Sequence, residues 1–174
     1  MLTDKPILFE AKDETNYYTW RIGYVEWESE TGTLTITTVQ RHNLAISLEA
    51  DEVTGFEIVQ REGISTLPHV ALGALLADWN TGLGCLLSLI LAPIALVDWI
   101  AAKRTRFPVI RLVQSNGDGA EQGWTLDLRS RKRGRRGREE TRALANRLAD
   151  VLHNTGYGGS MPDLSSDALW FNTR

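Results

Sequence analysis

The sequence predicts a mainly β protein with a C-terminal helix and an inserted apolar helical segment. Three observations predict this fold class. Short runs that alternate polar and apolar side chains occur before residue 62 and again after residue 106, as half-buried strands require. The stretch between them, residues 63–102, is almost free of charge. Residues 138–154 repeat apolar side chains at the spacing of one helix face.

Length and composition bound the answer further. The chain has 174 residues, 43% of them hydrophobic, which is enough for one domain with a core. Its single cysteine excludes an intramolecular disulfide. The net charge of −3 averages two unlike halves, because residues 1–80 hold thirteen acids against five bases and residues 81–174 hold nine acids against fourteen bases. The basic partner-binding features are therefore expected in the second half.

Strands are expected in close succession before residue 62. The runs are rich in β-branched and aromatic residues or alternate with period two, and short turn sequences separate them. Such spacing indicates an antiparallel meander. The expected strands cover residues 7–10, 20–27, 33–39, 44–48 and 53–59.

The apolar segment is the strongest single signal. Residues 82–97 carry no charge, Trp79 and Trp99 bracket them about 30 Å apart along a helix, and Lys103, Arg104 and Arg106 follow. This arrangement predicts a membrane anchor, with a buried core helix as the alternative. The anchor residues would be Trp79, Leu83, Leu86, Leu87, Leu89, Ile90, Leu91, Ile94, Leu96 and Trp99.

The preceding stretch leaves the number of crossings open. Residues 63–77 are also uncharged, so the insertion can form a helical hairpin whose arms of fifteen to eighteen residues are at or below the usual spanning length. A re-entrant hairpin, or one interfacial helix followed by one transmembrane segment, is the alternative.

After the insertion the β pattern resumes. Strands are expected at residues 107–114 and 124–128, then a helix over Arg138–Asn154 with Gly156 placed to end it, and an irregular tail. The predicted organisation is a first β half at 1–62, the apolar segment at 63–102, a second β half with its helix at 103–156, and the tail at 157–174.

The first half resembles GRAM and bacterial PH-like domains. The similarity lies in the run Gly32-Thr-Leu-Thr-Ile-Thr-Thr, in Arg41, and in Ile46-Ser-Leu-Glu-Ala-Asp-Glu-Val-Thr-Gly-Phe-Glu-Ile. The resemblance implies a PH-like bent β-sandwich with a helix plugging one end, interrupted here by the apolar insertion. It covers about 110 residues, so its implication is stronger for fold than for function.

The split of that fold has a topological consequence. If both β halves share one sheet system, they lie on the same side of any membrane, and the insertion enters and returns. The start of the sequence has no apolar signal region, which disfavours export of the acidic first half. The β-domain is therefore expected on the cytoplasmic side of an inner membrane. The competing interpretation is a single-pass protein with its acidic half outside and its basic half inside.

A run of seven cations in ten residues, 129–138, is the main candidate contact surface. Anionic lipid headgroups or an acidic face of a membrane protein complex are the expected partners, and nucleic acid is an unlikely one. The alternative is a solvent-exposed loop without a specific partner. The expected contact residues are Lys103, Arg104, Arg106, Arg129, Arg131, Lys132, Arg133, Arg135, Arg136 and Arg138.

No catalytic or metal-binding pattern is found in the sequence. His42, His69 and His153 are scattered, and Cys85 has no basic neighbour that would lower the pKa of its thiol. We therefore expect no catalytic residue, no metal and no cofactor. The predicted function is that of a non-catalytic, membrane-anchored PH-like interaction module, an accessory or assembly subunit of a membrane protein complex. The alternative is a soluble PH-like adaptor whose apolar segment packs on a partner.

Overall fold

A computed structural model describes residues 2–12, 17–39, 45–63, 83–115 and 123–171. The chain divides into two compact units. The first, called the sheet unit, contains Met1–Val59 and Pro108–Asn172. The second, called the α2 unit, contains Gln60–Phe107.

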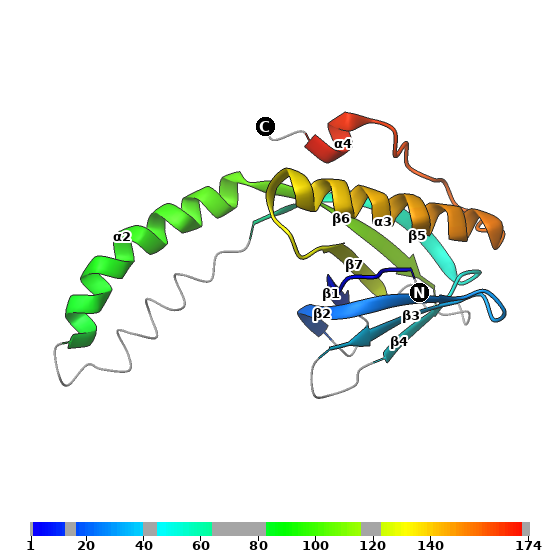
Figure 1. The fold of residues 1–174 in the computed structure, drawn as a ribbon, viewed down its shortest axis with the longest axis horizontal. Coiled ribbons are helices and arrows are strands. Elements are labelled where there is room, and N and C mark those ends of the chain that lie inside the picture. Colours follow the sequence, from blue (N-terminus) through cyan, green and yellow to red (C-terminus); the bar gives the residue numbers. More distant parts are fainter. Residues whose placement is uncertain (1, 13–16, 40–44, 64–82, 116–122, 172–174) are drawn as a thin grey trace. The chain divides into compact units, whose positions relative to one another are not determined.

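One antiparallel sheet of seven strands dominates the fold, in the order β4-β3-β2-β1-β7-β6-β5 (Figure 1). Strands β1 and β7 pair along their whole length, from Ile7 opposite Ser130 to Lys12 opposite Thr125, so strands on both sides of the insertion share the sheet. The strands are β1 (Ile7–Lys12), β2 (Tyr17–Glu28), β3 (Thr33–Thr38), β4 (Ala45–Glu49), β5 (Val53–Glu62), β6 (Arg106–Gln114) and β7 (Thr125–Ser130).

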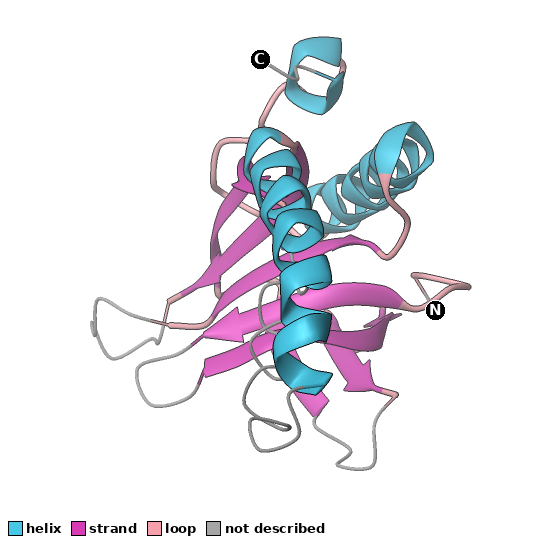
Figure 2. Cartoon of the chain, turned by 90° about the vertical axis from the view of Figure 1, so that its left-hand side faces the viewer, coloured by secondary structure: helices cyan, strands magenta, loops and turns pink. Residues whose placement is uncertain are grey.

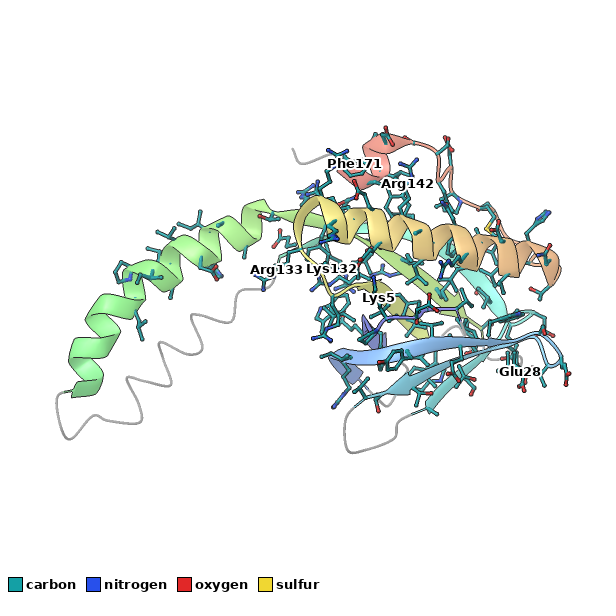
Figure 3. All side chains as sticks on the ribbon, in the orientation of Figure 1. Lys5, Glu28, Lys132, Arg133, Arg142 and Phe171 are labelled. Atoms are coloured by element: carbon teal, nitrogen blue, oxygen red, sulfur yellow. The ribbon has the colours of Figure 1, made fainter. Side chains whose placement is uncertain are left out.

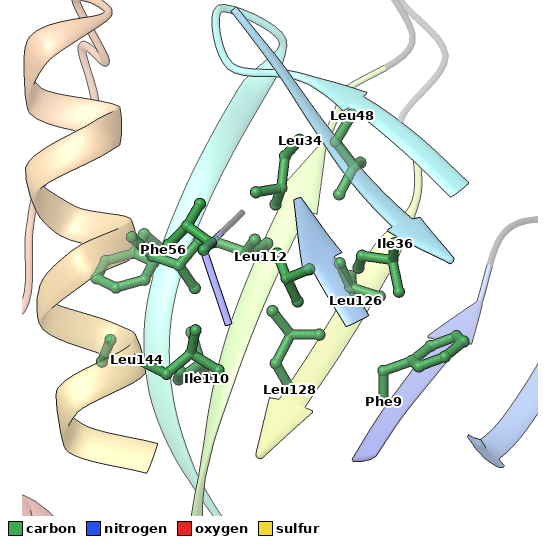
Figure 4. Packing of buried hydrophobic residues seen from close by; sticks show 14 of the residues in the cluster. Phe9, Leu34, Ile36, Leu48, Phe56, Ile110, Leu112, Leu126, Leu128 and Leu144 are labelled. Carbon is green, nitrogen blue, oxygen red and sulfur yellow. The ribbon is translucent and has the colours of Figure 1, made fainter. Parts of the chain in front are cut away.

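The alternation of the sequence becomes the two faces of this sheet. Strand β4 alternates exposed and buried residues, and Ile46 and Leu48 face inward opposite Ile36 and Leu34 of β3. Neighbouring positions on a strand point to opposite faces, so each strand gives every second side chain to the core. Figure 4 shows this core, in which Leu144 lies on the side of Phe56 and Ile110.

Two helices complete the sheet unit. Helix α3 (Gly134–Asn154) buries Leu144, Ala145, Leu148 and Leu152, which repeat at helical spacing. Figure 2 shows the chain from the side, with strands in magenta and helices in cyan. It ends where Gly156 adopts a φ of +85°, as expected. The short helix α4 (Asp167–Phe171) follows, and its Trp170 is only 1% exposed.

Two expectations for this region are corrected. Helix α3 begins at Gly134, one turn before the expected Arg138, so half of the basic run is helical and not a loop. The tail was expected to be irregular, but it contains α4, because burying Trp170 against the core favours an ordered turn of helix.

The α2 unit contains the insertion. Helix α2 (Leu83–Arg104) is 22 residues long, and its side chains are described from Leu91 to Ala102. The backbone N–H of Gly63, directly after β5, donates to the carbonyl oxygens of Ala102 (3.0 Å) and Thr105 (2.8 Å). The two ends of the insertion therefore lie side by side, where β5 and β6 are neighbours in the sheet.

The predicted transmembrane segment is wrong for the part of the chain that the structure describes. No helix there is long and apolar enough to cross a membrane. The physical reason is length: α2 begins only at Leu83 and meets the charge of Asp98 after fifteen uncharged residues, whereas a span needs about 20. The membrane-inserted fold class, the assignment as a membrane protein with a transmembrane helix, and the single-pass alternative are corrected accordingly. The first arm of the expected hairpin, residues 64–77, lies outside the described residues.

Candidate functional site

The most charged feature of the sheet unit is a cationic turn, which we define as residues 129–138. It starts at the end of β7, leaves the strand after Ser130 and enters α3 at Gly134. Arg133 precedes the helix with an extended backbone, and Gly134 follows with a φ of +66°. A positive φ is costly for residues with a Cβ atom, so the sharp change of direction depends on glycine here.

Hydrogen bonds fasten this turn to α3. The N–H of Ser130 donates to Thr141 Oγ1 (3.0 Å), and Thr141 Oγ1 donates to the carbonyl oxygen of Gly137 (2.8 Å). Ser130 Oγ donates to Glu140 Oε2 (2.6 Å) and accepts from the N–H of Lys132 (3.1 Å). At Gly137, any Cβ atom would overlap the carbonyl oxygen of Lys132, so strand end and helix approach closely. The cations are thus displayed on a fixed backbone.

Some of these cations already have partners within the chain. Lys132 Nζ pairs with Glu140 Oε1, and Arg135 Nε pairs with Glu139 Oε1 at 2.9 Å one helical turn away. The Arg129 guanidinium lies over the Trp20 ring, 4.9 Å from its centroid. Arg138 also interacts with a neighbour. These four positions are structural as well as basic.

Three cations differ from these. Arg131, Arg133 and Arg136 are exposed, and within the described ranges none has an acidic side chain at ion-pair distance. They surround the N-terminal end of α3, whose first turn contains no acidic residue and whose N-cap residue forms no side-chain hydrogen bond. The partial positive charge of a helix N-terminus repels cations, so this arrangement is electrostatically unfavourable for the isolated chain.

The pKa shifts of Arg129 and Glu140 reflect the electrostatic surroundings of the cationic turn. Burial and, to a smaller extent, the positive charge of Arg133 together lower the pKa of Arg129 to about 10. Burial of Glu140 opposes its ionisation, but hydrogen bonds from Lys132 and Ser130 and the charges of Lys132 and Lys5 outweigh burial. The pKa of Glu140 is therefore lower than usual, and the surroundings of the turn favour negative charge.

A cavity of about 190 Å³ adjoins the turn through Ser130 and Glu140. Its walls come from the N-terminal segment Leu2–Ile7, from β7 and from α3, and Arg147 closes one side by donating from Nη1 to the carbonyl oxygen of Leu2 at 2.9 Å. Lys5 and Arg147 bring positive charge to it, and Asp4 and Glu140 bring negative charge. Figure 3 labels Lys5 beside the end of α3 that carries Lys132 and Arg133.

A second charged group was not anticipated from the sequence. Arg111 of β6 binds the buried Asp127 of β7 through two hydrogen bonds, Nε to Oδ1 (2.8 Å) and Nη2 to Oδ2 (3.1 Å). The bond to Asp127 raises the pKa of Arg111. Glu10 of β1 lies opposite Asp127 in the strand register. Arg111, Asp127 and Glu10 thus lie side by side on three neighbouring strands, which indicates a structural role. Their proximity follows from the strand register and is not evident from the sequence.

The expected site residues separate into two sets. The seven cations of the turn belong to the sheet unit and lie around one helix end, whereas Lys103, Arg104 and Arg106 belong to the α2 unit. Of the expected anchor residues, Ile94, Leu96 and Trp99 are exposed and Leu91 is half-buried. Trp79 and the side chains of Leu83, Leu86, Leu87, Leu89 and Ile90, together with those of Lys103 and Arg104, lie outside the described residues.

Metal chemistry finds no support in the described ranges, where no group of three or more His, Cys, Asp or Glu side chains could hold an ion. No protein-family model matches the chain, and neither the curated proteins nor the solved structures contain a match to it.

Proposed function

We propose that this protein is a non-catalytic, PH-like interaction module, an accessory subunit that binds an anionic surface through its cationic turn. The observation that supports the proposal is the group Arg131, Arg133 and Arg136: three exposed guanidinium groups around a helix N-terminus without an acid in its first turn. A bound anion would accept hydrogen bonds from these groups and favourable interaction from the helix dipole.

The first turn of α3 lacks an acidic side chain, which would interact favourably with the helix dipole. A cation in the first turn of a helix destabilises it by about 0.3–1 kcal/mol, and a partner's negative charge reverses the sign. Each base held near an anionic lipid surface contributes about 1 kcal/mol. Three such bases on a rigid turn supply a useful, salt-sensitive affinity, and little ordering entropy opposes it.

The PH-like assignment rests on the sequence resemblance, and the seven antiparallel strands followed by a helix are compatible with it. The proposed location is the cytoplasmic face of the inner membrane, with the sheet unit at the surface of a membrane protein complex. The negative charge would come from phospholipid headgroups or from acidic side chains of that complex.

The test compares two double variants with equal charge loss. Arg131→Gln/Arg133→Gln removes two free cations of the turn, and Lys12→Gln/Arg106→Gln removes two exposed cations elsewhere. Binding is measured to phosphatidylcholine vesicles with and without phosphatidylserine, to a polyglutamate peptide and to duplex DNA, each at low and high salt. We expect the turn variant to bind either the phosphatidylserine vesicles or the polyglutamate peptide roughly 30-fold more weakly, because each of the two bases contributes about 1 kcal/mol. The control variant should lose less affinity.

The probes also identify the partner. A loss on phosphatidylserine vesicles indicates headgroups, and a loss on polyglutamate alone indicates an acidic protein face. Equal losses by both variants would show that affinity follows net charge and not the turn. A loss on DNA alone would replace the proposal by nucleic-acid binding.

A charge reversal gives a second test. Arg136→Glu places an acid in the first turn of α3, so we expect the free energy of unfolding to rise by about 0.3–1 kcal/mol while anion binding falls. If stability and binding both fall, Arg136 supports the fold, and the proposed role of the turn is wrong.

A further inference from the structure

The described part of α2, residues 91–102, carries an apolar surface that the other described residues leave exposed. Ile94 (52%), Leu96 (55%), Val97 (68%), Trp99 (43%) and Ile100 (38%) are all exposed. At 3.6 residues per turn, the exposed positions from 92 to 101 span about 220° of the helix circumference, and none of them is charged. Monomeric proteins seldom present such a continuous patch to water.

The opposite side of the helix is shielded. Ala95 is 5% exposed, and Leu91, Asp98 and Ala102 are half-buried, at a spacing of four, three and four residues. Asp98 also has an interaction partner. The helix therefore has one face packed within its own unit, and the exposed arc remains after that packing.

The exposed residues form a seam suited to another helix. Pro93, Leu96, Val97 and Ile100 follow the pattern i, i+3, i+4, i+7, and Ile94 and Trp99 flank them. This is the pattern of a helix face that packs on a neighbouring helix. The exposed Ala92 and Ala101 at its two ends leave room for a close approach.

We propose that this seam binds the same seam on a second copy of the chain, so that two α2 helices pair antiparallel about a two-fold axis near Leu96 and Val97. The inference goes beyond anion binding and does not depend on it. The exposed apolar area of the seam supports a second copy of the chain as its partner. At roughly 150–200 Å² for a large apolar residue, the five side chains expose about 450 Å² per copy. Two copies together offer about 900 Å² of exposed apolar surface, and with Ala92, Pro93 and Ala101 the area available reaches the roughly 1,000 Å² expected of a specific interface.

Charge determines the direction. Lys103 and Arg104 end α2, and Arg106 follows. A parallel pair would bring these cations together, whereas an antiparallel pair about an axis near Leu96 and Val97 separates them by roughly 20 Å along the helices. The same patch on both copies meets in the antiparallel arrangement, as two-fold symmetry requires.

The experiment uses the full chain and two matched substitutions. Val97→Glu and Val39→Glu make the same chemical change at two exposed valines, the first in the seam and the second in the sheet unit at 56% exposure. Mass in solution is measured by light scattering and sedimentation at micromolar concentrations. We expect a dimer for the unchanged chain and for Val39→Glu, and at least tenfold weaker dimerisation for Val97→Glu. Circular dichroism checks that all three are folded.

Cysteine crosslinking tests the direction. In a Cys85→Ala background, Val97→Cys is expected to form an intermolecular disulfide, because the two copies of residue 97 lie next to the axis. Ala101→Cys is expected to form none, because its two copies are too far apart in an antiparallel pair.

Any of four results would contradict the inference. The unchanged chain could be monomeric throughout the concentration range, or Val97→Glu could dimerise like Val39→Glu. If monomers bind phosphatidylcholine vesicles in a flotation assay and Val97→Glu abolishes this binding, the seam binds a lipid surface instead. Crosslinking of Ala101→Cys would contradict the antiparallel arrangement.

Discussion

Leu126 in β7 and Val97 in α2 are both branched apolar residues within regular structure, yet Leu126 is 0% exposed and Val97 is 68% exposed. The contrast holds for the regions around them. In the sheet unit, apolar side chains alternate with polar ones, and those on the inward face of the strands form the core. In the described part of α2, residues 91–102, apolar side chains occur around most of the helix, and one face is shielded. Hydropathy thus shows how much burial a segment requires, whereas the rest of the chain determines how much it receives.

The largest effect is expected in the core of the sheet unit. Phe9 is 0% exposed and packs within the central cluster, so Phe9→Ala removes a large buried ring and leaves a cavity. We expect a loss of about 3–5 kcal/mol in the free energy of unfolding, measured by urea denaturation. A loss below about 1 kcal/mol would mean that the core is not packed as described.

An intermediate effect is expected where charge is buried in the sheet. Asp127→Asn keeps the shape of the side chain but removes the charge that Arg111 binds. We expect a loss of about 2 kcal/mol in urea denaturation, because the guanidinium remains partly buried without its counter-ion. The exposed Asp150→Asn is the control, and equal losses in the two variants would refute the special role of Asp127.

A smaller, pH-dependent effect is expected at Glu140. Its pKa in the folded chain lies below the usual 4.5, so ionised Glu140 stabilises the fold above pH 4.5, and this contribution is lost as the pH falls through the folded pKa. The difference in unfolding free energy between the unchanged chain and Glu140→Gln should therefore be greatest above pH 4.5 and shrink below it. Glu139→Gln, on the exposed surface of the same helix, is the control with equal charge loss.

The smallest effect is expected in α2. Val97→Ala removes two methyl groups that already contact water, so at concentrations where the chain is monomeric the unfolding free energy should change by less than about 0.5 kcal/mol. A growing difference at higher concentration would indicate dimers, since association stabilises the folded state. A large loss in the monomer would remove the contrast between the two regions.

The strands could be predicted because their signal is local. The expected strand at 33–39 is observed at Thr33–Thr38, and the strand expected from Val53 begins there, because alternation and turn residues act over few positions. The pairing of β1 with β7 joins residues more than a hundred positions apart. Alternation carries no information on such partners, so sheet order was expected only through the family resemblance.

The candidate site was predicted in composition but not in arrangement. The basic run was evident, but the sequence did not show that Trp20 lies under Arg129 or that Thr141 fixes Ser130. The early start of α3 was also missed. Gly134, Gly137 and several cations are poor signals for a first helical turn, and contacts with the strand end override them. The membrane prediction was wrong because a run without charges resembles a span even when the helix contains only fifteen uncharged residues before Asp98.

The hydrogen bonds from Gly63 to Ala102 and Thr105 bring both ends of the insertion to one point of the sheet. From the standpoint of chain entropy, these bonds close the connection between β5 and β6 at its base, and residues 64–104 make up its length. Shortening a loop from about forty residues to five lowers its closure cost by roughly 2 kcal/mol. We therefore expect that a short turn can replace the insertion, and that a chain with this replacement retains the seven-stranded sheet.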